Sequence, residues 1–280
     1  MNSIGTLEGA LQLGAGLGYL LASLGYSAFL QLRNRNLIGF GRVAAACAVL
    51  LHTGAIGVHC AAAHTTPFTS PADALSASAW AIAVVTLLLE AVFKLAPSAL
   101  AAIAMPAAFF CLFTGSVMHD PTRVHDPLSQ SILASNMISL HVLAILFAYG
   151  LSVLAFACAL LYVLHHRLLK HKRVGGGLFG KLPPLAKLDQ LAFTLVVFSF
   201  TLLTIGLLSG AIRVGAAGWP DGWASDQKIV ASLLTWFVYG IYLVLHHASR
   251  WRGVRANYLL LVGPVLTLIT FFVPTSVHRY

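Results

Sequence analysis

Long stretches without a charged side chain constrain this chain more than any motif in it. Of its 280 residues, 59% are hydrophobic and only 9% are charged, whereas a soluble domain carries about 25% charged residues. A helix that spans a bilayer needs roughly 20 consecutive apolar residues. Stretches of at least that length occur at 9–32, 43–72, 95–119, 127–166, 190–212, 229–249 and 256–278. The sequence therefore predicts a polytopic membrane protein.

Loop signals divide these stretches into eight expected helices. A further stretch, 74–93, is interrupted only by Glu90, while Pro67 and Asp126-Pro127 mark loops. We therefore expect an all-α fold: a bundle of eight transmembrane helices forming a single integral membrane domain, residues 1–280. The expected helices lie near 7–31, 38–62, 75–94, 98–118, 137–165, 190–213, 229–247 and 256–274.

The distribution of basic residues predicts the orientation of this bundle. If the amino terminus is outside, the outer side keeps only Arg123, Arg213, Lys228 and Arg279 of the 17 Lys and Arg residues. The remaining basic residues then face the cytoplasm, as the positive-inside rule requires. Both termini are expected to be exoplasmic, in a multi-pass protein of the cell (inner or plasma) membrane. The net charge of +9 then needs no nucleic-acid partner.

The cysteines and acids exclude several kinds of chemistry. Cys47, Cys60, Cys111 and Cys158 are isolated, and no CxxC or CxxCH motif occurs, which argues against covalent haem attachment to this chain. With eight acidic residues in all, general acid–base catalysis has few candidates. We expect no independent catalysis.

Two histidines predicted at one membrane face indicate a cofactor. His141 opens the fifth expected helix and His278 follows the eighth, and a loop with Trp219, Trp223 and Asp226 lies between them in the sequence. A low-spin haem iron takes two neutral imidazoles, and its apolar ring packs against aromatic side chains. The alternatives are an interfacial tryptophan belt and a solvated terminal histidine.

Two further histidines fall inside or at the end of expected helices. His52 lies near the middle of the second and His246 at the inner end of the seventh. An intramembrane ionisable residue is by default a candidate for function. The pair could hold a second haem, although His246 lies nearer the inner surface than His52. His59, two turns from His52, could instead join the outer site.

Several segments in order give the chain a family resemblance. They are Ser139-Leu-His141 to Tyr149, Leu202 to Gly210, Trp219 to Lys228, Leu233 to His246 and Trp251 to Arg255. The chain resembles the cytochrome c assembly family of haem-handling membrane proteins, of the CcsA type, and is most similar to its short HemX and YpjD members. The resemblance is strongest over 135–280.

The resemblance implies roles for the candidate residues. It implies that His141 and His278 ligate haem b at the tryptophan-rich loop, and that His246, with His52 as partner, ligates a transmembrane haem. One or two haems, bound non-covalently, would then be presented for attachment to apocytochrome c. The loop departs from the family pattern at Ser225, Gln227 and Ile229, so haem binding could persist while apocytochrome ligation is lost or belongs to a partner.

Two other functions remain open from the sequence. The HemX resemblance implies a membrane regulator or scaffold that binds a tetrapyrrole-synthesis enzyme, and the basic segment 166–189 would carry that contact or a contact with acidic lipid. A small-solute permease is the third possibility, indicated only by Pro97, Pro106 and Pro264.

Overall fold

The computed structural model describes residues 3–32, 34–63, 70–92, 97–118, 136–172, 182–217, 223–248, 251 and 253–272. Within these ranges all regular secondary structure is helical, which confirms the predicted all-α class. The helices are α1 (Ser3–Leu32), α2 (Asn36–Ala63), α3 (Pro71–Val92), α4 (Pro97–Met118), α6 (Asn136–Lys170), α7 (Leu185–Ala217), the 3-10 helix η2 (Trp223–Ser225), α8 (Gln227–Ala248), α9 (Val254–Leu260) and α10 (Val262–Phe272).

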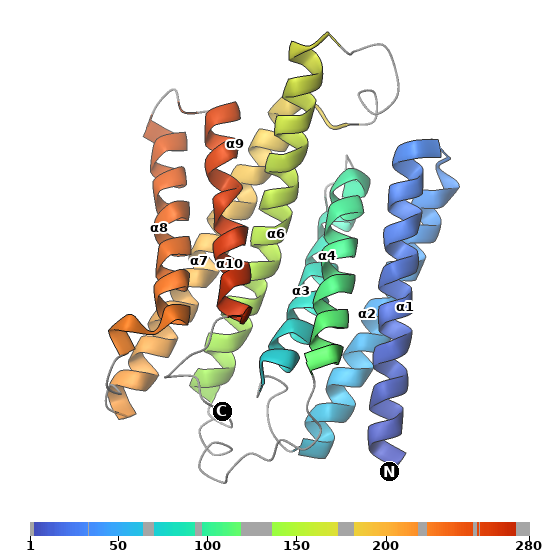
Figure 1. Ribbon diagram of the computed structural model, residues 1–280, viewed down its shortest axis with the longest axis vertical. Helices are drawn as coiled ribbons and strands as arrows, with labels where there is room; N and C mark the ends of the chain where they lie inside the picture. Colours follow the sequence, from blue (N-terminus) through green and yellow to red (C-terminus); the bar gives the residue numbers. More distant parts are fainter. Residues whose placement is uncertain are drawn as a thin grey trace.

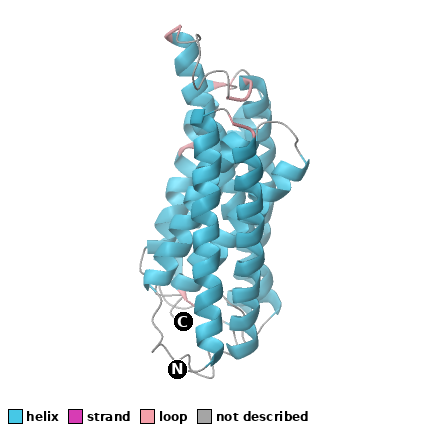
Figure 2. Ribbon diagram, turned by 90° about the vertical axis from the view of Figure 1, so that its right-hand side faces the viewer, coloured by secondary structure: helices cyan, strands magenta, loops and turns pink. Residues whose placement is uncertain are grey.

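The helices form an elongated up-and-down bundle with two halves (Figures 1 and 2). Helices α1–α4 make one half, and α7–α10 make the other. The 35-residue helix α6 runs between them and packs against α3 and α4 on one side and α7, α9 and α10 on the other. We call the end at which α1, α3, α6 and α8 begin the lower end, as in Figure 1, and the opposite end the upper end.

Small residues bring the helices close together. An added Cβ at Gly18 of α1 would lie 2.7 Å from the Cβ of Ala48 on α2, and one at Gly150 of α6 would lie 3.3 Å from the backbone of Ala81 on α3. Such close backbone approach is typical of helix association in membranes, where dispersion contacts replace the hydrophobic effect. Alanine accordingly dominates the buried positions.

Large apolar side chains lie on the outside of the bundle. Leu13, Leu50 and Val117 are each at least 70% exposed. In water these surfaces would be a large aggregation-prone patch, whereas lipid chains solvate them. Seven helices are long and apolar enough to cross a bilayer, counted over the described residues.

The predicted eighth helix is divided into two. Helix α9 ends at Leu260 and α10 begins at Val262. Pro264 lies in the first turn of α10, where its missing N–H is tolerated, but its ring would clash with the carbonyl of residue 260 in a continuous helix. The expected uninterrupted span near 256–274 is therefore wrong over the described part, because one imino acid outweighs the apolar composition.

Other helix ends differ from the predicted ends for local reasons. Helix α3 begins at Pro71 rather than 75, because Ser70 and Asp73 cap it reciprocally: each backbone N–H donates to the other side chain, at 3.0 and 3.1 Å. Helices α6 and α7 extend into the basic segment 166–189, because Lys and Arg favour helix as strongly as Leu does. Charge therefore marks where the apolar span ends and not where the helix ends.

Candidate functional site

His141 lies in the second turn of α6 and faces α7. Its Nδ1 is 2.6 Å from the backbone carbonyl oxygen of Gly206. A carbonyl only accepts, so Nδ1 carries the proton and donates it. In the neutral ring the lone pair then lies on Nε2, the arrangement found where histidine ligates a metal through one nitrogen and is held by the other.

Two glycines of α7 make room for this imidazole. A Cβ at Gly210 would lie 2.7 Å from His141 Nδ1 and 2.8 Å from its Cε1, and a Cβ at Gly206 would lie 2.6 Å from Ile145. Both distances are shorter than real Cβ contacts. The segment from Leu202 to Gly210, singled out in the sequence, therefore serves as a cradle for the histidine.

The tryptophan-rich segment ends in a helix cap. Asp226 is buried, and its Oδ1 accepts from the backbone N–H groups of Lys228 and Ile229 at 3.1 and 3.3 Å. It thereby caps α8, a role that the sequence analysis did not assign. Trp223 is 37% exposed in η2, as a residue awaiting a partner ring would be. Trp219 and His278 lie outside the described residues.

An aromatic and hydroxyl layer joins α6, α7 and α8 beyond His141. Trp236 donates from Nε1 to Thr204 Oγ1 at 2.8 Å and stacks on Phe200 with ring centroids 5.1 Å apart. The Tyr149 and Ser232 hydroxyls are 3.2 Å apart. Sequence reasoning noted Tyr149 and Trp236 but not their partners, because the pairing crosses 32 and 83 positions in the chain.

His52 lies in the other half of the molecule and is fully buried. Its Nδ1 is 3.1 Å from the hydroxyl of Tyr19 on α1, and its Nε2 is 2.9 Å from the hydroxyl of Ser76 on α3. Both ring nitrogens therefore hold helices together. Iron ligation by His52 would require one of these hydrogen bonds to break.

His246 lies near the upper end of α8 and is also buried. Its Nε2 is 3.2 Å from Asp189 Oδ2 on α7, and its ring stacks on Phe193 with centroids 4.6 Å apart. Since His52 contacts α1 and α3 while His246 contacts α7, the structure does not bring the two together.

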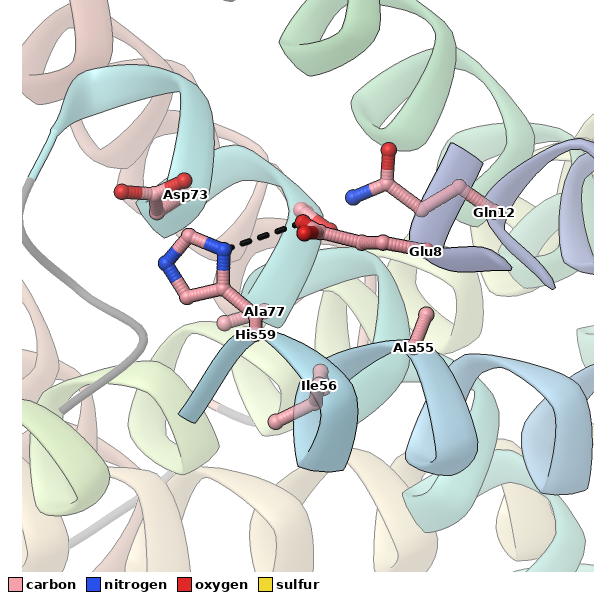
Figure 3. A pocket seen from close by; sticks show the side chains of 8 residues that line it. Glu8, Gln12, Ala55, Ile56, His59, Asp73 and Ala77 are labelled. Carbon is pink, nitrogen blue, oxygen red and sulfur yellow. Dashed lines mark hydrogen bonds and ion pairs between the residues drawn. The ribbon is translucent and has the colours of Figure 1, made fainter. Parts of the chain in front are cut away.

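His59 belongs to a small polar pocket at the lower end of α1–α3 (Figure 3). Its Nδ1 is 2.9 Å from Glu8 Oε1, and Asp73 and Gln12 line the same pocket. The ion pair with Glu8 explains why α1 can start with an acid. His59 therefore joins α1 to α2, and the described residues give it no contact with His141.

Comparison with known proteins agrees with this architecture. The family described as Cytochrome C assembly protein matches residues 71–279. A protein named "Cytochrome c biogenesis protein CcsA" from Guillardia theta is 26% identical over 271 residues, covering 90% of this chain and 88% of the relative. One of the same name from Synechococcus sp. (strain CC9605) is 25% identical, covering 90% of this chain and 92% of the relative.

The family match and the fold lead to one conclusion. The match spans α3 to α10 and so includes both His141 and His246. The seven long apolar helices make the chain a multi-pass integral membrane protein. The chain belongs to the cytochrome c assembly protein family.

Proposed function

We propose that this protein binds haem at the outer face of the cell membrane and presents it for cytochrome c maturation. The observation that carries the proposal is the geometry of His141: Nδ1 is bound to the Gly206 carbonyl at 2.6 Å, which directs the lone pair to Nε2. The relatives named for cytochrome c biogenesis support the same role.

The residues at the lower end fit a haem. Gly206 and Gly210 cradle the imidazole, and Trp223 offers an exposed indole on the neighbouring η2–α8 connection. Lys228 on α8 and Arg213 on α7 supply cations of the kind that pair with propionates. His278 and Trp219 are proposed as the second ligand and a further aromatic contact, and Asp226 supports the site by capping α8. Bound haem b would supply the vinyl groups to which a cytochrome's cysteines attach.

The protein's own residues supply binding and orientation, with no group placed for catalysis. Hydrogen bonding by Gly206 fixes the His141 ring, and the α6–α7–α8 layer of Tyr149 and Trp236 holds the helices that carry it. We therefore propose a haem chaperone or conduit that acts with other assembly proteins.

The charge distribution supports an outer location for this site. Most basic residues that the structure describes lie at the upper end, among them Arg35, Arg167, Lys170, Lys187 and Arg255, while Arg213 and Lys228 lie at the lower end. The positive-inside rule then makes the upper end cytoplasmic and the termini exoplasmic. The α9–α10 pair would be the eighth pass.

An absorption spectrum of the purified protein tests the proposal. We expect a Soret band that is lost in His141→Ala and retained in His247→Ala, because His247 is exposed on α8. Wild-type protein without haem, or a band insensitive to His141→Ala and to His141→Ala combined with His278→Ala, would overturn it.

A further inference from the structure

Four polar side chains of three helices meet inside the upper end of the bundle. Asp189 comes from α7, Tyr242 and His246 come from α8, and Asn257 comes from α9. Tyr242, His246 and Asn257 are buried, with at most 8% of each residue exposed. A buried polar cluster in an apolar bundle costs free energy unless its members satisfy one another, so it calls for a purpose.

Two helices hold the Asp189 carboxylate in place. Its Oδ1 accepts from Asn257 Nδ2 at 3.2 Å, and its Oδ2 faces His246 Nε2 at 3.2 Å. Asn257 Nδ2 also donates to the Gly253 carbonyl at 2.9 Å. Since both partners of this nitrogen are acceptors, the orientation of the Asn257 amide is determined by chemistry.

The His246 ring is fixed by packing as well as by this bond. It lies nearly parallel to Phe193, at 22°, and its centroid is 5.5 Å from that of Tyr242. An ionised carboxylate only accepts, so the Nε2 that faces Asp189 carries a proton. In the neutral ring the lone pair lies on Nδ1, the reverse of the arrangement at His141.

The cluster has unused hydrogen-bonding capacity. Asn257 Oδ1 and the Tyr242 hydroxyl are buried and have no hydrogen-bond partner among the described residues. One can accept and the other can donate. Buried polar groups are paired in more than nine cases of ten, so these two atoms indicate that the cluster is built to receive a polar or charged group.

We infer that Asp189 is the positioning residue of His246: it fixes the ring as the Nε2–H tautomer and so offers Nδ1 to a haem iron at the inner end of the bundle. The inference rests on the proposed function, because it concerns a second haem of the same protein. It makes the two histidines different ligands. His141 is held by a neutral carbonyl, whereas His246 is held by a carboxylate, which makes an imidazole more basic and stabilises ferric iron.

The test uses the full-length protein in nanodiscs with ¹⁵N-labelled histidine, reduced so that low-spin haem is diamagnetic. The His246 signals are assigned by their loss in His246→Gln. We expect a protonated Nε2 and a metal-bound Nδ1. In a His141→Ala background, which removes the outer ligand, Asp189→Asn should raise the midpoint potential of the remaining haem, and Asp189→Glu should restore it.

The matched control is Glu90→Gln, which neutralises another buried carboxylate near the upper end, paired with Arg42 and Tyr26 in the other half. It should leave the potential unchanged. A protonated Nδ1 on His246, equal potentials in the Asp189→Asn and parent proteins, or an equal shift in Glu90→Gln would overturn the inference. Haem in the wild type with none left in His141→Ala would overturn it alone, whereas no haem in the wild type would overturn the proposed function.

Discussion

The two candidate ligand histidines of the α6–α10 half are held in opposite ways. At the lower end, His141 donates from Nδ1 to a backbone carbonyl and fits a gap left by two glycines. At the upper end, His246 turns Nε2 to a carboxylate and lies flat on Phe193. The first depends on the shape of one helix and the second on charge from another. Changes of shape should therefore affect the lower site, and changes of charge should affect the upper one.

The largest effect should follow from filling the His141 cradle. In Gly210→Val the new side chain would overlap the imidazole, because even a Cβ lies 2.7 Å from Nδ1. Loss of a group that orients a metal ligand costs about 10–100-fold in affinity, and displacement of the ligand itself belongs at the upper end of that range. Haem titration followed at the Soret band measures it.

Gly57→Ala is the control for that change, because a Cβ at Gly57 meets nothing within 4 Å. It should leave haem affinity as it is. Unchanged affinity in Gly210→Val would show that the cradle does not set the position of His141.

A smaller effect is expected from His52→Leu, and on stability alone. The change removes the hydrogen bonds to Tyr19 and Ser76. Side-chain hydrogen bonds within membranes contribute about 0.6 kcal/mol each, up to about 1.7, so unfolding in SDS should show a loss of roughly 1–2 kcal/mol. Loss of one of two haems in this variant would instead make His52 an iron ligand, as the family resemblance implies.

Asp226 provides a test of the cap that precedes α8. Asp226→Ala removes the acceptor for the N–H groups of Lys228 and Ile229, and loss of such a cap costs about 1 kcal/mol. The SDS unfolding midpoint should fall, and Asp226→Asn should restore most of it, because Asn caps as well as Asp. If Asp226→Asn behaves like Asp226→Ala, the negative charge rather than the cap is what the site needs.

The smallest effect is expected from Trp236→Phe. The variant keeps an aromatic ring against Phe200 but loses the bond to Thr204. We expect a loss of about 0.6 kcal/mol and an unchanged haem spectrum. A shifted Soret band would mean that Trp236 contacts the haem directly.

The described helices show where sequence reasoning succeeds and where it stops. The apolar stretches predicted seven of the long helices to within about five residues at each end, since length and hydrophobicity alone decide whether a segment spans. Pro264 was noticed but not given its effect, because a single residue carries little weight in an average over composition. Asp189 was not singled out, since an acid near the start of a helix is unremarkable until its partners are known.

The sequence by itself determined that this chain is a helical membrane protein and which residue types could hold a cofactor. Those conclusions follow from the cost of placing charges and unpaired backbone groups in lipid, which any sequence must obey. The tertiary structure decided which nitrogen each histidine presents and separated His52 from His246. A tautomer depends on the atom about 3 Å away, and that atom belongs to a helix 57 or 65 positions along the chain.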